Sequence, residues 1–347
     1  MKRPGLKDVA EMAGVSIATV SYVINNTPSQ SLSTETIKRV NDAIKELGYI
    51  PNLAARTLVN NKSNLLGVLI PQTESGKELM FSNPFYGDFM SAAEYTARKS
   101  GYHIMISGAD SGQTYAEVAR TRGLDGVIVV GMNDDEECRQ LKNLNIPVVL
   151  VDSYCEASGF HRVSVDDMQG GYMATRYLLE KGLRKIAHVT GHVKDGGVNF
   201  LRYKGYEKAL GEYGLKTEES LLLSGEVSFE YGCEIGEYLA GLAERPDGVF
   251  VSSDILAVGL CMRLRGRGLG IPKDISVIGF DDSLLSKTCD PPLTTIHQDA
   301  TAKGAKAVEL LISENHTPQN KVFPLILVER GSVRGSCLEN KTTSILS

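Results

Sequence analysis

The sequence predicts an α/β protein in which a small N-terminal unit of three helices precedes a larger body of two lobes built from parallel sheets. Residues 1–48 show apolar side chains at helical spacing, with glycines where the helices should end. From Leu65 onward, short apolar segments alternate with amphipathic helical patterns, which is typical of parallel sheets covered by helices. Residues 64–335 are more than one sheet with a single core usually takes, so we expect two lobes.

Composition and length exclude several classes of protein. The chain has 347 residues, of which 42% are apolar and 23% charged, and these values argue against disorder, collagen repeats and a membrane bundle. No apolar run approaches the roughly 18 residues of a membrane helix, and the start lacks the apolar stretch of a secretory signal. We therefore expect a cytoplasmic protein. Its six cysteines are widely spaced and are expected to be free thiols rather than metal ligands.

Charge is distributed unevenly between the two parts of the chain. Residues 1–62 contain eight Lys or Arg against five Asp or Glu, a net charge of +3. Because the whole chain has a net charge of −5, the remainder has −8. A basic N-terminal part on an acidic body is compatible with a polyanion-binding unit, although this difference alone does not establish one.

The first two helices are predicted by an apolar stripe, a glycine and a cap. The stripe of the first helix consists of Leu6, Val9, Ala10 and Ala13. Gly14 can adopt the left-handed conformation of a tight turn, and Ser16 is placed to cap a second helix over residues 16–25. This helix buries Val20 and leaves an unusual apolar and phenolic surface open to water. That surface consists of Ile17, Ala18, Ser21, Tyr22 and Asn25.

A third helix follows, with Ser33 as its cap, Glu35 in its first turn and Gly48 at its end. A helix, a glycine turn and a short helix with exposed small and hydroxyl side chains form the layout of a helix-turn-helix, whose second helix enters the DNA major groove. Periodicity alone is equally compatible with a plain three-helix bundle.

The residues themselves resemble the LacI/GalR family of bacterial transcription regulators. The segment DVAEMAGVSIATVSYVIN at residues 8–25 resembles the family's DNA-reading motif, YIPNLAARTL at 49–58 resembles its hinge, and LLGVLIP at 65–71 resembles its first ligand-domain strand. The order and spacing of these blocks are far more specific than any single block, and the resemblance continues to about residue 335. It implies a sequence-specific transcription regulator that is not an enzyme and uses no cofactor or metal.

The resemblance also implies which residues of the first part contact DNA. Base edges would be contacted from Ile17, Ala18 and Tyr22, where thymine methyl contacts and the Tyr22 hydroxyl provide the direct readout because the other two side chains have no polar end. Ser16, Ser21 and Asn25 are suited to phosphate contacts. Two hinge segments of a homodimer would fold together in the minor groove of operator DNA, where an apolar wedge from each kinks the duplex. The hinge contacts would be Asn52, Ala55 and, as the wedge, Leu58.

For the body, the resemblance implies a periplasmic-binding-protein-like (type I) fold of two Rossmann-like parallel sheets. The chain would cross between the lobes near Val163, Pro291 and Phe323. The expected parts are a helix-turn-helix head at 1–48, a hinge helix and linker at 49–63, an effector-binding and dimerisation domain at 64–335 and a tail at 336–347. Within the domain, the N-lobe would take residues 64–163 and 292–322, and the C-lobe residues 164–290 and 323–335.

Polar side chains follow several of the predicted strands, at the edge where parallel sheets bind ligands. The family's effector contacts map onto Phe85, Asp152, Arg202, Ser253, Asp281 and Gln298. Carboxylates and a guanidinium in a cleft suit polyols, because each hydroxyl both donates and accepts hydrogen bonds. The resemblance therefore implies a repressor of carbohydrate-utilisation genes that is controlled by a sugar or a sugar phosphate.

Three alternatives compete with this hypothesis. A regulator of the same fold that depends on a corepressor or a partner protein is equally compatible with the sequence, as are induction and corepression. A sugar-binding transport component would need only the body, and the DNA-reading segment argues against it. Enzyme chemistry at Asp281 and Asp282, or a metal at His188 and His192, lacks the spacing that such sites require.

Overall fold

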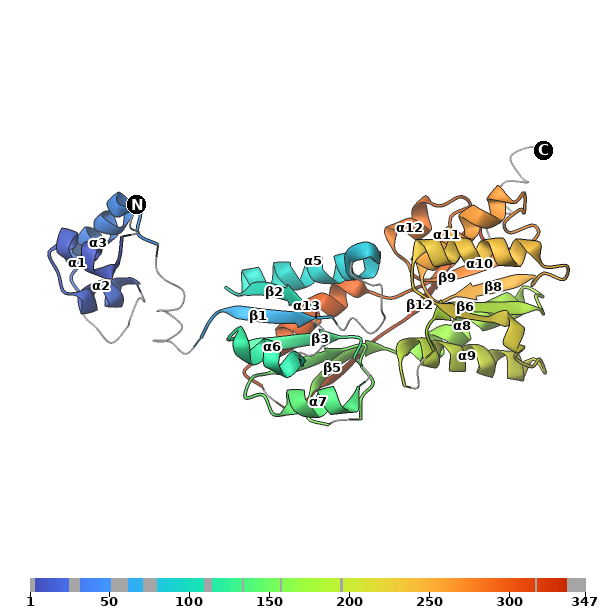
Figure 1. Cartoon of the computed structure of the whole chain (residues 1–347), viewed down its shortest axis with the longest axis horizontal. Helices are drawn as coiled ribbons and strands as arrows, with labels where there is room; N and C mark the ends of the chain where they lie inside the picture. Colours follow the sequence, from blue (N-terminus) through green and yellow to red (C-terminus); the bar gives the residue numbers. More distant parts are fainter. Residues whose placement is uncertain are drawn as a thin grey trace. The chain divides into compact units, whose positions relative to one another are not determined.

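The computed structural model describes residues 4–24, 32–50, 62–70, 80–108, 114–132, 134–156, 158–193, 196–315 and 317–335. It divides into two compact units, residues 1–64 and residues 65–347 (Figure 1). The α/β class and the two sheets dominated by parallel strands are confirmed. The expected hinge helix falls on residues 51–61, which lie outside the described ranges. Within those ranges, no helix is both long and apolar enough to cross a membrane.

The first unit, which we call the head, contains the three predicted helices. They are α1 (Leu6–Ala13), α2 (Ile17–Ile24) and α3 (Thr34–Leu47). Gly14 ends α1 at a φ of 63° and Gly48 ends α3 at a φ of 60°, a left-handed conformation that glycine adopts without strain. The Ser33 hydroxyl accepts a hydrogen bond from the Thr36 amide and so caps α3. Val9, Val20 and Val40, one from each helix, are fully buried in the shared core.

The first lobe contains a six-stranded sheet in the order β11-β5-β4-β3-β1-β2, with all neighbouring strands parallel. Its strands are β1 (Leu65–Leu69), β2 (His103–Ser107), β3 (Gly126–Val130), β4 (Val148–Val151), β5 (His161–Val165) and β11 (Asn320–Phe323). Helices cover both faces (Figure 1). One face packs against α5 (Pro84–Lys99) and α13 (Ala300–Leu311), and the other against α6 (Tyr115–Thr121) and α7 (Asp135–Lys142).

The second lobe repeats this architecture with the order β12-β10-β9-β8-β6-β7, in which only β12 runs antiparallel. Its strands are β6 (Ile186–Gly191), β7 (Leu222–Gly225), β8 (Gly248–Val251), β9 (Ser276–Asp281), β10 (Thr294–His297) and β12 (Ile326–Val328). The helices on one face are α8 (Asp167–Glu180) and α9 (Val198–Glu212), and on the other α10 (Phe229–Gly241) and α11 (Asp254–Gly266), with the short α12 (Leu284–Thr288) following β9.

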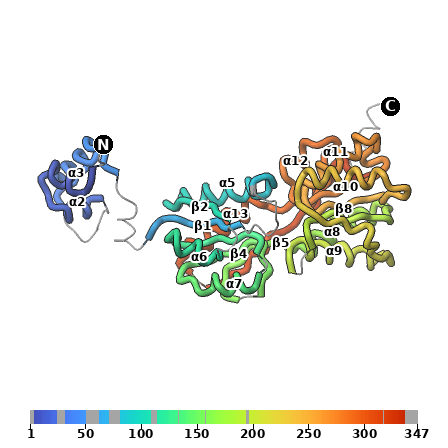
Figure 2. The backbone as a smooth tube through the Cα atoms, in the orientation of Figure 1, coloured from blue at the N-terminus to red at the C-terminus, as the bar shows by residue number. Residues whose placement is uncertain are grey.

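The chain passes between the two sheets three times (Figure 2). The first passage follows β5, which ends at Val165, and the third joins β11 to β12. The expected second crossing near Pro291 is wrong. Strand β10 pairs with β9 and belongs to the second sheet, so the chain leaves that sheet only after His297. Ile296 of β10 is fully buried in the core of the second lobe, and this burial holds the strand there.

The expectation that all six cysteines are free thiols is also wrong, because Cys138 and Cys155 form a disulfide. Cys138 lies one turn into α7, which begins beyond the carboxyl end of β3, and Cys155 follows β4. Because β3 and β4 are parallel neighbours, the two cysteines lie at the same edge of the sheet. Among the described residues the free cysteines are Cys233, Cys261 and Cys289.

Candidate nucleic-acid interface and ligand cleft

The open face of α2 is the candidate DNA-reading surface of the head. Val20 points into the core, while Ile17 is 49% and Tyr22 36% exposed, and Ala18 is exposed between them. Among the described residues of the head, neither Ile17 nor Tyr22 belongs to the hydrophobic core or to the partly buried side chains packed against it. This face therefore offers apolar atoms and one phenol to a partner surface.

Two of the expected phosphate contacts are already engaged within the head. The Ser16 hydroxyl accepts a hydrogen bond of 3.1 Å from the Thr19 amide, and so it caps α2. Ser21 is half-buried. The remaining predicted DNA contacts, Asn25, Asn52, Ala55 and Leu58, lie outside the described residues.

In the body, the carboxyl ends of β8, β9 and β10 bring three predicted ligand contacts together around Asp281. The Ser253 hydroxyl donates to Asp281 Oδ2 over 2.9 Å, and the Gln298 amide donates to Oδ1 over 2.7 Å. Asp281 has a φ of 119°, which aspartate rarely adopts outside functional sites. Burial raises the pKa of its carboxyl group, and the nearby Arg202 guanidinium opposes that shift. The three side chains form one fixed array of donors and acceptors.

Lys303 extends this array into the first lobe. Its side chain is fully buried on α13, where the ammonium donates to Gln298 Oε1 over 2.9 Å and to Asp152 Oδ2 over 2.5 Å. Asp152 follows β4 and so joins the end of the first sheet to the network. Burial raises the pKa of the Asp152 carboxyl group, and the charge of Lys303 opposes that shift. The Lys303 ammonium also lies 5.1 Å from the centre of the Phe85 ring, within cation–π distance.

Helical periodicity in the sequence predicts that Lys303 is buried. Lys303 falls on the same helical stripe as Ala300, Ala307 and Leu310, all of which are buried. Periodicity therefore places its ammonium on the inner face of α13, where a lysine is found only with a partner. The identity of that partner depends on contacts across 151 positions of the chain, which no local pattern predicts.

Arg202, the sixth predicted contact, is held in a second buried cluster. Its Nε donates to Asp167 Oδ1 over 2.8 Å, and its Nη1 donates to the Ser252 carbonyl over 2.6 Å. The guanidinium lies 3.7 Å from the centre of the Phe280 ring. The Tyr154 hydroxyl donates to the other oxygen of Asp167, so the loop after β4 reaches this cluster as well. Arg202 is therefore fixed in orientation beside Ser253.

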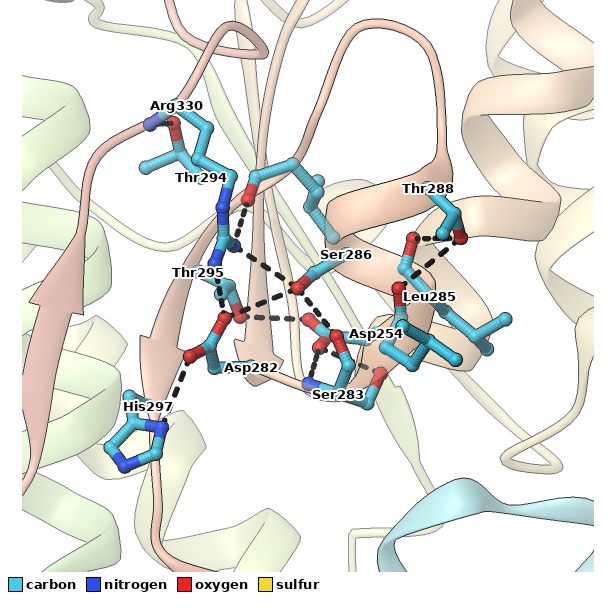
Figure 3. Close-up of polar contacts among 12 residues, drawn as sticks. Asp254, Asp282, Ser283, Leu285, Ser286, Thr288, Thr294, Thr295, His297 and Arg330 are labelled. Atoms are coloured by element: carbon cyan, nitrogen blue, oxygen red, sulfur yellow. Dashed lines mark hydrogen bonds and ion pairs between the residues drawn. The ribbon is translucent and has the colours of Figure 1, made fainter.

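A pocket of about 90 Å³ opens beside the Asp281 array. It is lined by Phe85, Asp88, Asp281, Asp282, Ser283, His297, Gln298, Asp299, Ala300 and Thr301. Figure 3 shows how Asp282 is held at this pocket between His297 and Arg330. The His297 Nδ1 atom lies 3.1 Å from Asp282 Oδ2, and Arg330 donates to Oδ1 over 2.5 Å.

Asp254 follows Ser253 after β8 and supports the turn after β9. It is fully buried at the start of α11, where its Oδ2 accepts from the Ser283 amide over 2.7 Å and its Oδ1 accepts from the Thr295 hydroxyl over 2.7 Å (Figure 3). Burial and the charge of Asp281 raise the pKa of the Asp254 carboxyl group to about 8. These bonds fix the backbone that carries Asp281 and Asp282.

The two histidines considered as a metal pair have separate surroundings. His188 is fully buried and stacks on Phe250 with ring centres 4.6 Å apart, and burial lowers its pKa to about 3. His192 is exposed beyond the end of β6. Among the described residues, no group of three potential ligands has the arrangement of a metal site.

Two family models match the chain. The model described as bacterial regulatory proteins, lacI family, matches residues 5–52, and that of the periplasmic binding protein-like domain matches residues 175–333. Among curated relatives, the HTH-type transcriptional repressor PurR of Vibrio atlanticus is 32% identical over 95% of this chain and 98% of its own length. The HTH-type transcriptional regulator RegA of Clostridium saccharobutylicum is 35% identical over 94% of this chain and 98% of its own.

Solved structures of transcription regulators are also similar to this chain over nearly its full length. The lac repressor dimer bound to operator and the anti-inducer ONPF has a TM-score of 0.82 at 27% identity, with 95% of this chain and 99% of that chain covered. A complex of the transcriptional regulator CelR with cellobiose has a TM-score of 0.68 at 29% identity, with 95% and 100% covered.

Proposed function

This chain belongs to the lacI family of bacterial regulatory proteins, and from that premise we propose that it represses carbohydrate-utilisation genes in response to an uncharged sugar. Membership of the family makes it a DNA-binding transcription repressor and not an enzyme. Proteins of the family bind operator DNA and small-molecule effectors, and they dimerise. The effector class, the contact residues and a cytoplasmic location on chromosomal DNA are parts of the proposal.

The observation that carries the proposed effector class is the hydrogen-bonding array around Asp281. Ser253, Gln298 and Asp281 place a hydroxyl, an amide and a carboxylate within one array beside the pocket. A sugar hydroxyl can both donate and accept a hydrogen bond. It can therefore bond either to a donor or to an acceptor of this array, so that no buried polar group is left unpaired. The CelR complex with cellobiose is similar to this chain over the full length of the CelR chain.

The charges around the cleft favour an unphosphorylated sugar over a sugar phosphate. Carboxylates outnumber cations there, and the buried cations Arg202 and Lys303 already have carboxylate partners. A phosphate group would therefore meet uncompensated negative charge and no free cation within the described lining. The carboxylates are Asp88, Asp152, Asp167, Asp281, Asp282 and Asp299, and the cations are Arg202, Lys303 and Arg330.

The proposed operator contacts are those of the exposed face of α2 together with the hinge. The exposure of Ile17, Ala18 and Tyr22 supports direct contact with base edges. Phosphate contacts are assigned to Ser16, Ser21 and Asn25, and minor-groove contacts to Asn52, Ala55 and Leu58. An isologous homodimer on a near-palindromic operator is supported by large apolar side chains that the single chain leaves exposed, namely Tyr95, Met262 and Leu284.

The test is to select bound fragments from random duplexes with the full-length protein and then to titrate sugars into the complex. We expect cellobiose or another uncharged sugar to change operator affinity by roughly 5- to 150-fold, the usual range of such coupling. The 6-phosphate of the same sugar should have little effect. A response to phosphorylated sugars alone would contradict the proposed effector class.

The Asp281→Ala variant should lose the sugar response and keep operator binding, because Asp281 is at the centre of the array. The matched control is Asp290→Ala, since the Asp290 side chain is 76% exposed and lies outside the pocket lining. A normal sugar response in Asp281→Ala would remove this carboxylate from the proposed site.

A further inference from the structure

The disulfide between Cys138 and Cys155 lies in the same short loop as two residues of the cleft network. Asp152, Tyr154 and Cys155 all follow β4 within four positions. Asp152 accepts from Lys303, and Tyr154 donates to Asp167, the partner of Arg202. The loop therefore connects the sulfur pair to both buried cations of the cleft.

We propose that Cys138 and Cys155 form a reversible redox site, oxidised by a hydroperoxide and reduced by a small thiol, whose state alters the ligand cleft. Disulfides in the bacterial cytosol are usually transient and redox-sensing rather than permanent. The proposal takes the cytosolic setting from the proposed function, but the chemistry at the two sulfurs does not depend on which effector or operator the protein binds.

The surroundings of the two sulfurs assign them different roles. Cys155 is 6% exposed beside the exposed Glu156, whereas Cys138 is fully buried on the inner face of α7. The Arg162 Nη2 atom lies 3.8 Å from the Cys155 sulfur, and a guanidinium at this distance favours a thiolate. Cys155 is therefore the thiol that reacts with the oxidant, and Cys138 is the one that resolves the product.

The reaction balances with the hydroperoxide as the sole oxidant. The Cys155 thiolate attacks one oxygen of hydrogen peroxide, the O–O bond breaks, and the products are a sulfenic acid and one water after proton transfer. The Cys138 sulfur then attacks the Cys155 sulfur, the S–O bond breaks, and a second water leaves. The two thiols lose two electrons to the peroxide. Two equivalents of a small thiol then reduce the Cys138–Cys155 bond by exchange: both cysteines return to thiols, and the small thiols leave joined as their own disulfide.

The loop is held firmly enough to transmit a change at Cys155. Arg162 donates to the carbonyls of Ser153 and Cys155, each over 2.8 Å. The Ser153 hydroxyl accepts from the Met132 amide, which ties the loop to the end of β3. Asp152, in the same loop, has a left-handed φ of 47°, a conformation that a residue other than glycine keeps only where the surrounding contacts hold it. Bond formation at Cys155 therefore changes the geometry at Lys303 and Arg202.

The first experiment examines the bond in the full-length protein without DNA or sugar. The protein is reduced with dithiothreitol, treated with hydrogen peroxide, alkylated and digested for mass spectrometry. After peroxide treatment we expect a disulfide-linked pair of peptides that contain Cys138 and Cys155. This pair should be missing when the native protein is reduced with dithiothreitol before alkylation. The Cys289→Ser control should form the same pair to the same extent. A bond that dithiothreitol leaves intact in the native protein, or oxidation without this cross-link, would overturn the proposal.

The second experiment compares the oxidised and reduced wild-type protein by hydrogen exchange, so that no variant has to fold. We expect at least a several-fold difference in exchange in peptides that contain Asp152 and Lys303, and unchanged exchange in α10, which is remote from the loop. Equal exchange at the cleft in both states would refute the coupling. Because neither arm uses an effector, both results stand even if the proposed sugar response fails.

Discussion

Replacing Lys303 by methionine tests the contacts that join the two lobes at the cleft. Methionine fills much of the same volume but removes the ammonium that donates to Asp152 and Gln298. Lys303 is 0% and Asp152 7% exposed, so water has little access to replace the lost donor. Removing one partner of a buried ion pair costs about 3–5 kcal/mol of folding free energy. At about 2–4 °C per kcal/mol, the Tm of the body should fall by roughly 6–20 °C.

The pH dependence of this loss identifies its cause. Burial already raises the pKa of the Asp152 carboxyl group against the opposing charge of Lys303, and the substitution raises it further. The folded variant then holds a proton on Asp152 at pH values where the unfolded chain, with an aspartate pKa of about 3.9, does not. Stability from such a group is greatest in acid and is lost as the pH rises through the folded pKa. The Tm difference between wild type and variant should therefore widen as the pH rises above the unfolded aspartate pKa of about 3.9.

Differential scanning calorimetry of the full chain measures both effects. The matched control is Lys306→Met, one turn along α13, where the lysine is partly exposed and pairs with Glu309 at the surface. The double variant with Asp152→Asn should recover part of the loss, because it removes the uncompensated charge. A Tm fall of less than about 2 °C, or a fall that is the same at every pH, would refute the reasoning.

Three further predictions concern other sites. Tyr22→Phe should change base preference at one operator position in a selection experiment; a uniform loss of affinity across sequences would mean that the hydroxyl contacts only the backbone. Gly171→Ala should lower the Tm strongly, since the added Cβ would lie 2.0 Å from the Arg202 carbonyl oxygen and force α8 and α9 apart; an unchanged Tm would contradict this contact. Asp254, whose folded pKa of about 8 exceeds its unfolded value, gives stability that is lost as the pH rises toward and through 8. Asp254→Asn should flatten that slope in calorimetric pH series, and an unchanged slope would assign it to another group.

The residues of the head are sufficient to predict its structure because its signals are short-range. The stripe that includes Val9, the glycine at 14 and the cap at Ser33 each act within one or two helical turns, and the structure has all three. The alternation of strands and helices likewise predicted two parallel sheets, since buried parallel strands need continuous apolar runs. The family's blocks at fixed spacing indicated where polar groups would meet at the strand ends.

What the residues could not reveal depends on contacts between distant segments. Lys303 meets Asp152 across 151 positions, β10 joins the second sheet because Ile296 completes its core, and Cys138 reaches Cys155 because β3 and β4 are neighbours. A local pattern specifies which side chains are buried but not which partner they meet. Pairing is fixed only when both cores are packed, because burial is what obliges each polar group to find a partner.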